Sequence, residues 1–283
     1  MNKTIEDILS EKTKLEAFNL LKEGFGEKYE KLFKNFLLFT KNKPDKRLGL
    51  LLKDDSVAVG VLLLIEKDRI FEGKCYKFIN TSSWYCKKQY RSFATILLKK
   101  IILESPENSI LTSFTGNSTS IKIFNELGFN HFDVRFTPVD INILKYSPST
   151  KINLINGNIP TFIPINIQEI FNNLSSKNIY NFALYNQLKR EECFFSLCFF
   201  QKKGLRFARI LYASDPKVFV KNLSKIKLNL LINYRCFGLL FPNFGAYKLI
   251  SFSFKTNGQY LFKSSKKLDN IDLLFSEFTE LLN

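Results

Sequence analysis

A short segment rich in basic and small residues joins an apolar run to a helical pattern at residues 84–96. It reads Trp-Tyr-Cys-Lys-Lys-Gln-Tyr-Arg-Ser-Phe-Ala-Thr-Ile. Backbone N–H groups in the first turn of a helix have no partner inside the helix and lie at the positive end of its dipole. They can hold a phosphate group without a dedicated side chain, and small residues let it approach closely. The segment therefore favours a diphosphate site, although strand-to-helix turns occur in every α/β protein.

A second polar segment has the signals of a capped helix. It reads Asn-Ser-Thr-Ser-Ile-Lys-Ile-Phe-Asn-Glu-Leu-Gly-Phe over residues 117–129. Asn117 or Ser118 can cap the start of this helix, and Gly128 can end it in a left-handed conformation.

In these two segments the chain resembles the GNAT superfamily of acyl-CoA transferases. Residues 89–94, Gln-Tyr-Arg-Ser-Phe-Ala, are similar to the family's Gln/Arg-x-x-Gly-x-Gly/Ala pyrophosphate loop, with Ser92 where a glycine is usual. Residues 117–129 match the family's Asn-x-x-Ala-x-x-Leu-Tyr-x-x-x-Gly-Phe helix without gaps. A loop that starts at Arg91 would place Ile96 at the last glycine, so we prefer the start at Gln89. The resemblance covers about residues 20–137.

The resemblance implies a chemistry and a set of binding residues. Acetyl-CoA or another acyl-CoA would be the co-substrate, without a metal, and its acyl group would pass directly to an amine in a ternary complex. The family's general-acid tyrosine corresponds to Phe124, which has no proton to give, but a CoA thiol with a pKa of about 8.5 leaves with modest help. A backbone N–H at the end of the central strand would stabilise the oxyanion. The implied cofactor-binding residues are Trp84, Tyr85, Cys86, Gln89, Tyr90, Arg91, Ser92, Phe93, Ala94, Thr95, Asn117 and Phe124.

The acceptor side of the reaction is less specified. Candidates for moving the acceptor's proton are Ser83, Tyr85 and His131, the last because its pKa lies near neutrality. Core packing accounts equally well for Trp84 and Tyr85, and a surface position accounts for His131. The acceptor would be an amine on a small molecule, sugar or peptide, with a hydroxyl acceptor left open. Phe124 and Ser92 motivate a second hypothesis, a non-catalytic CoA sensor or interaction module with the same fold.

Elements of an α/β fold must position these residues. Apolar stripes predict helices over residues 3–23 and 26–41. Apolar runs predict a hairpin at residues 48–67, and further runs predict strands at residues 75–86, 109–115 and 130–139. Helices over residues 91–104 and 117–127 separate these strands. We expect a GNAT-like mixed, mostly antiparallel sheet flanked by helices.

The second half of the chain repeats this order less clearly. Three prolines lie among residues 146–164, so we predict an acyl-CoA-binding domain at 1–147, a linker at 148–164 and a second α/β domain at 165–283 on the acceptor side. Its patterns predict a hairpin around Gly204, a helix over residues 216–233, a strand at 236–242 and a closing helix at 271–283. A degenerate GNAT-like copy would have this order.

Composition bears on whether the protein binds a metal, binds nucleic acid, is exported or crosses a membrane. The five cysteines lack paired spacing and there is one histidine, so we expect free thiols and no metal site. The net charge of +16 comes from lysines spread along the chain, which does not predict a nucleic-acid partner but attracts a phosphate-rich cofactor. We find neither an export signal nor an apolar run long enough to cross a bilayer. A cytoplasmic protein without a membrane partner is expected, of undetermined oligomeric state.

Overall fold

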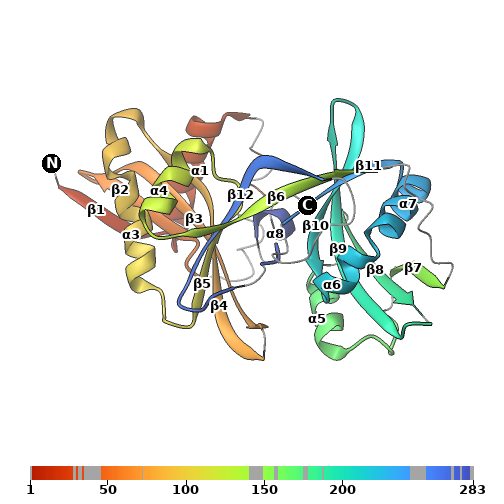
Figure 1. Cartoon of the computed structure of the whole chain (residues 1–283). Coiled ribbons are helices and arrows are strands. Elements are labelled where there is room, and N and C mark those ends of the chain that lie inside the picture. The colour runs from red at the N-terminus through yellow and green to blue at the C-terminus, as the bar shows by residue number, and fades with distance from the viewer. Residues whose placement is uncertain are drawn as a thin grey trace. The chain divides into compact units, whose positions relative to one another are not determined.

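The computed structural model (Figure 1) places the described residues in two compact units. The first contains Met1–His131, Gln259–Leu268 and Phe275–Leu282, and the second contains Phe132–Gly258 and Asp269–Leu274. The residues that the structure does not describe are 1, 28–29, 31–33, 35–45, 72, 140–148, 156–158, 175–177, 187, 243–252, 269–270, 275 and 281–283.

The strands of the first unit lie side by side in the order β1-β2-β3-β4-β5-β12. Among its described pairs, β4 and β5 run parallel and the others antiparallel. Its elements are β1 (Lys3–Asp7), α1 (Glu11–Phe25), β2 (Gly49–Asp54), β3 (Val57–Phe71), β4 (Lys74–Cys86), the 3₁₀-helix η2 (Lys88–Phe93), α3 (Ala94–Glu104), β5 (Ser109–Ser113), α4 (Ser118–Glu126), α8 (Glu277–Glu280) and the part of β12 (Phe254–Ser264) that follows Gly258.

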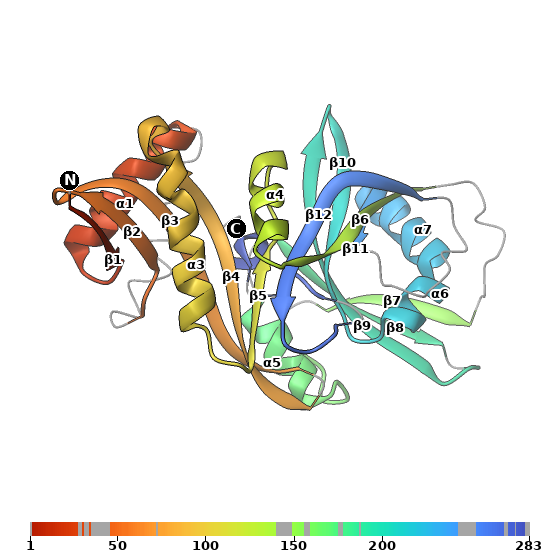
Figure 2. The same ribbon diagram turned by 60° about the vertical axis from the view of Figure 1, so that its left-hand side comes forward.

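The apolar strands of this sheet contribute side chains to a hydrophobic core on each of its two faces. Successive side chains of a strand point to opposite faces, so Leu51 packs with α1 while its neighbours Leu50 and Leu52 pack with α3 and α4. The two helices α1 and α3 therefore cover opposite faces, as Figure 2 shows. Every residue of β2 is buried, which explains why its sequence is apolar on both faces.

The second unit has the sheet order β6-β11-β10-β9-β8-β7, with β10 and β11 parallel. Helices α6 and α7 pack on one face through Phe219, Ile226 and Leu230, and α5 packs on the other through Phe171. Its elements are β6 (Asn130–Pro138), β7 (Thr150–Ile155), α5 (Ile165–Asn173), β8 (Ile179–Asn186), β9 (Glu191–Lys202), β10 (Leu205–Ala213), α6 (Pro216–Lys221), α7 (Leu223–Tyr234) and β11 (Cys236–Pro242).

Both units repeat one topology. In the first, the antiparallel strands β2, β3 and β4 lead through η2 and α3 to the parallel strand β5. In the second, β8, β9 and β10 lead through α6 and α7 to the parallel strand β11. The predicted fold class, a mixed and mostly antiparallel sheet flanked by helices, is confirmed, and the second unit repeats the order of elements of the first, as expected of a degenerate copy. Each parallel strand then pairs with a strand from the other half of the sequence, β5 with β12 and β11 with β6.

Several predicted boundaries are wrong. The helix predicted over residues 3–23 begins at Glu11, after Ser10 caps it by accepting a hydrogen bond from the Thr13 N–H. Residues 3–7 before it form β1, which pairs antiparallel with β2 and alternates half-buried and exposed side chains. The helix predicted at 216–233 is divided into α6 and α7 at Asn222. The helix predicted at 26–41 falls mostly outside the described residues.

The predicted linker and domain limits also differ from the structure. Residues 148–164 include β7, which pairs with β8. The segment 165–283 is divided between the two units, because Gln259–Leu268 belongs to the first. Of the closing helix predicted at 271–283, residues 277–280 form α8, whereas residues 271–274 are not helical.

Lys53 gives a test of the core of the first unit. Its ammonium group is almost buried and pairs with Glu6 at 2.6 Å and Glu16 at 2.7 Å, and these hydrogen bonds raise its pKa, that of Glu16 most. Lys53→Met should lower the free energy of unfolding by about 2 kcal/mol, because it leaves two carboxylates without their partner.

Urea unfolding measures this loss, with Lys203→Met in an exposed turn as the control. The stabilisation of the fold by charged Lys53 is fully present below the ordinary lysine pKa of about 10.4. It is lost as the pH rises through the raised pKa that Lys53 has in the folded protein. Equal unfolding midpoints for the Lys53 variant and the parent at neutral pH would contradict the prediction.

Candidate functional site

Strands β4 and β5 form a parallel pair over only part of β4. The described ladder joins residues 77–80 to residues 109–112. At its end, the Asn80 amide donates to the Thr112 hydroxyl and the Thr81 hydroxyl donates to the Thr112 carbonyl, each at 3.0 Å. Strand β4 continues to Cys86, so residues 82–86 lie beyond the described ladder. Backbone N–H and C=O groups on that edge can bind an extended ligand.

A β-bulge lies at the start of this free edge. Leu62 pairs with Trp84 and Leu64 pairs with Thr81, so Ser82 and Ser83 together oppose Leu63. Bulges of this kind bend a strand, redirect its side chains and are over-represented next to active sites. The candidate Ser83 lies within the bulge.

Trp84 packs on the face of the sheet that α3 and α4 cover. Its ring meets the buried ring of Phe124 edge to face, with centroids 6.0 Å apart, and Phe124 meets Phe129 at 4.8 Å. The indole Nε1–H is buried and has no hydrogen-bond partner among the described residues. An unsatisfied buried donor costs about 1–3 kcal/mol, so an acceptor supplied by a ligand would be favoured there.

Tyr85 faces the opposite side of the sheet and packs against α1. Its hydroxyl donates to Glu23 at 3.4 Å, and its ring lies 6.3 Å from that of Phe25. A Cβ atom on Gly24 would come within 2.3 Å of the Tyr85 ring, so the glycine is required by this contact. Burial raises the pKa of Tyr85, and Glu23 raises it further. Its phenol is therefore protonated at neutral pH.

Cys86 ends β4 as a buried neutral thiol. It donates a hydrogen bond to the carbonyl of Tyr90 at 3.2 Å. Burial raises its pKa to about 11, against a smaller opposing effect of Arg91. Only the thiolate is a good nucleophile, so Cys86 acts in packing and not as a nucleophile at neutral pH.

The predicted pyrophosphate loop has a helical conformation. Residues 88–93 form η2, and the Ala94 N–H donates to the Arg91 carbonyl. The predicted loop is therefore a 3₁₀-helix, and the helix predicted over residues 91–104 begins at Ala94. The Tyr90 hydroxyl donates to Asp54 at 2.8 Å and ties this turn to the end of β2. That hydrogen bond raises the pKa of Tyr90.

The remaining residues of the loop divide into exposed and packed groups. Gln89, Arg91 and Ser92 are exposed, Ala94 is buried and Thr95 is half-buried in the first turn of α3. Phe93 lies under the Lys3 ammonium, 3.8 Å from its ring centroid. Neither η2 nor α3 has a side-chain cap or an acidic residue in its first turn. The surface of this turn is therefore suited to an anion.

Helix α4 begins as predicted. The side chain of Asn117 accepts a hydrogen bond from the Ser120 N–H at 2.9 Å, and Gly128 follows the helix with a φ of 79°. The structure thus gives Asn117 a capping role. His131, the third catalytic candidate, is exposed at the second residue of β6.

Two features of the site were missing from the sequence analysis. The first is Asp54, which accepts a hydrogen bond from the Tyr90 hydroxyl. Its only indication in the sequence is that a charged residue ends an apolar strand, all of which is buried. Asn80 and Thr112 close the ladder, and their signal is the polar run Asn-Thr-Ser-Ser inside an apolar strand at residues 80–83.

Comparison with solved structures identifies the architecture. A GCN5-related N-acetyltransferase from Anabaena variabilis is 11% identical, with a TM-score of 0.60 over 92% of this chain and 72% of that one. One from Kribbella flavida is 7% identical, with a TM-score of 0.55 over 92% and 70%. This chain has the GNAT fold.

A third similar structure is a conserved protein from Enterococcus faecalis described as a probable N-acyltransferase, 9% identical, with a TM-score of 0.56 over 93% of this chain and 73% of that one. No family model matches the chain, and no curated protein matches it in sequence. The resemblance inferred from residues 89–94 and 117–129 is thus confirmed for the fold.

Two kinds of feature are absent from the described residues. They contain no helix that is both long and apolar enough to cross a membrane. They contain no group of three or more His, Cys, Asp or Glu side chains that could hold a metal ion.

Differential alkylation tests the state of Cys86 in this GNAT fold. Native protein treated with iodoacetamide at pH 8 should react quickly at the exposed Cys75 and slowly at Cys86 and Cys193, because burial raises the pKa of both buried thiols to about 11. Peptide mass spectrometry gives the rate at each cysteine, and urea-unfolded protein, in which all the thiols react, is the control. Equal rates at Cys75 and Cys86 in native protein would contradict the assignment.

Proposed function

We propose that this chain transfers an acyl group, acetyl in the simplest case, from an acyl-CoA to an amine. The observation that carries the proposal is the free edge of β4, which begins with a bulge and leads directly into η2 and α3. The GNAT fold supports it, since two of the solved structures that share the fold are N-acetyltransferases. The first unit would be the acyl-CoA-binding domain and the second would cover the acceptor.

The diphosphate of the CoA would bind at η2 and the start of α3. Arg91 is exposed and has no ion pair among the described residues, and Gln89 and Ser92 are exposed beside it. A guanidinium group matches phosphate oxygens with two parallel hydrogen bonds. The small side chains at Ser92 and Ala94 would let the diphosphate approach the backbone.

The extended part of the CoA and the thioester would lie along residues 82–86 of β4. Backbone N–H groups at this edge would pair with the ligand, and one of them would polarise the thioester carbonyl. Phe124 cannot protonate the departing thiolate. The unpaired Nε1–H of Trp84, whose ring contacts Phe124, is a donor that could hydrogen-bond to the bound acyl-CoA.

The attacking amine must lose a proton during transfer. Ser83, Tyr85 and His131 keep their proposed roles as candidates, and the raised pKa of Tyr85 suits a proton donor better than a base. The acceptor class is a small molecule, sugar or peptide amine, and a cytoplasmic location stays a prediction. The apolar Phe124 also favours a second candidate function, a CoA sensor without turnover.

Calorimetric titration tests the proposed cofactor site. Acetyl-CoA should bind with micromolar affinity, and the Arg91→Glu, Ser92→Glu double variant should bind at least about tenfold more weakly, because it places two carboxylates beside the diphosphate. Lys74→Glu, an exposed charge reversal at the other end of β4, is the matched control and should bind as the parent does.

The outcomes separate the two candidate functions. Release of CoA from acetyl-CoA in the presence of amine acceptors supports the enzyme, whereas tight binding without release supports the sensor. Absence of binding by the intact protein would contradict both.

Trp84 offers an independent readout, because it is the only tryptophan in the chain. Acetyl-CoA should move its fluorescence emission to longer wavelength as the Nε1–H gains an acceptor, with the same Kd as calorimetry gives. Tyr85→Phe, on the other face of β4, should leave this shift unchanged. Calorimetric binding with no change in emission would place the ligand away from Trp84.

A further inference from the structure

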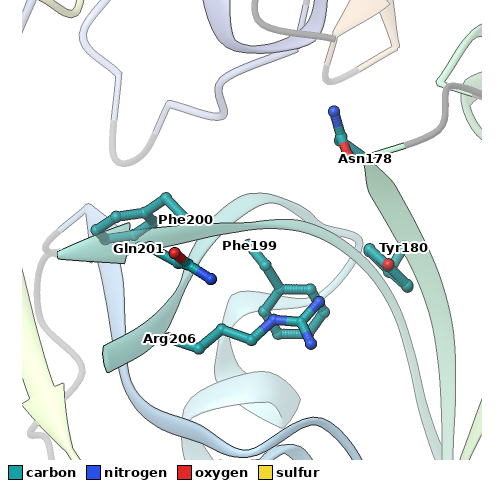
Figure 3. Close-up of a pocket in the computed structure, with 6 residues that line it drawn as sticks. All are labelled: Asn178, Tyr180, Phe199, Phe200, Gln201 and Arg206. Atoms are coloured by element: carbon teal, nitrogen blue, oxygen red, sulfur yellow. The ribbon is translucent and has the colours of Figure 1, made fainter. Parts of the chain in front are cut away.

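A pocket of about 360 Å³ lies in the second unit, between the ends of β8, β9 and β10. Its rim and walls are drawn in Figure 3. The residues that line it are Asn178, Tyr180, Phe199, Phe200, Gln201 and Arg206. The acyl-transfer proposal uses none of them.

Arg206 is the charged residue of this pocket, and it is held in place by two contacts. Its guanidinium lies over the Phe199 ring at 4.1 Å (Figure 3), and one of its nitrogens donates to the carbonyl of Tyr234 at 3.3 Å. That carbonyl belongs to the last residue of α7, where helix carbonyls attract a cation. These contacts fix the plane of the guanidinium and leave most of its five N–H donors for another partner.

No acid neutralises this half-buried cation among the described residues. The structure records no ion pair for Arg206 there, and the lining set contains no Asp or Glu. Three lining side chains add neutral polar groups, namely the amides of Asn178 and Gln201 and the phenol of Tyr180. The pocket therefore has one uncompensated positive charge, which matches a ligand group with one negative charge.

The wall beside Arg206 is aromatic and ordered by packing. Phe199 contacts Tyr180 at 4.9 Å and Tyr234 at 5.3 Å between ring centroids. Tyr180, Phe199 and Arg206 share one face of the sheet, as the strand register requires. Flat rings of this kind favour a flat apolar body on the ligand.

We propose that this pocket binds a small monocarboxylate with a flat, apolar body. The planar guanidinium of Arg206 would take the carboxylate with two parallel hydrogen bonds, and the rings of Phe199 and Tyr180 would contact the body. A doubly charged phosphate would keep one of its charges uncompensated in this half-buried site, and removing that charge from water is costly, so the singly charged carboxylate is favoured.

Benzoate is the probe for this pocket, because it combines one carboxylate with one flat ring. Calorimetric titration of the full chain should show one saturable site. Arg206→Gln should weaken binding at least tenfold, and Arg206→Lys, which keeps the charge but loses the planar fork, should weaken it by a smaller factor. Lys202→Gln, an exposed charge in the same hairpin, should change the Kd less than twofold.

Ligand controls use the parent protein and so do not depend on the folding of a variant. Benzyl alcohol, with the same ring and no charge, should bind at least tenfold more weakly than benzoate, and inorganic phosphate should not displace benzoate. The proposal is overturned by absence of saturable benzoate binding, by equal binding to Arg206→Gln, or by equal affinity for phosphate. These experiments contain no acyl-CoA, so their failure is independent of the acyl-transfer proposal.

Discussion

The early end of the parallel pairing between β4 and β5 is the constraint on which the candidate site depends. Thr112 accepts two hydrogen bonds at this point, one through its hydroxyl from the Asn80 amide and one through its carbonyl from the Thr81 hydroxyl. A full ladder would satisfy the backbone of β4 internally and leave no edge for a ligand. The bulge at Ser82 and Ser83 begins where the ladder ends, so the free edge and the bend in the strand arise together. The position of Trp84 against Phe124 follows from this local geometry.

The side chains around the free edge divide according to the face of β4 on which they lie. Trp84 packs in the core with α3 and α4. Tyr85 packs against α1, where Gly24 has no side chain that would collide with its ring. Cys86 and Tyr90 connect the end of the strand to η2, and Asp54 connects η2 to β2. The proposed binding surface is thus supported by contacts to the neighbouring helices and to β2, which would preorganise it.

Local patterns in the sequence predicted the features that local interactions decide. The cap at Asn117, the end of α4 at Gly128 and the hairpin around Gly204 are set by residues within a few positions of one another. Strand β1 was missed because its conformation depends on pairing with β2, more than forty residues away. The bulge was missed because register depends on both strands, and the sequence of β4 alone does not define it.

Strand β12, late in the sequence, pairs with β5, and strand β6, earlier in the sequence, pairs with β11. This pairing has a consequence for folding. Lys263 on β12 donates to the carbonyl of Leu127 at the end of α4, across 136 residues of sequence, and Leu261 fills the core below α4. The outer edge of β5 therefore stays uncovered until the chain has been synthesised through β12. Contacts of such long range slow folding, because a large loop must close before they form. During translation, the nascent first half would carry an unpaired strand edge, which is the kind of surface that chaperones protect.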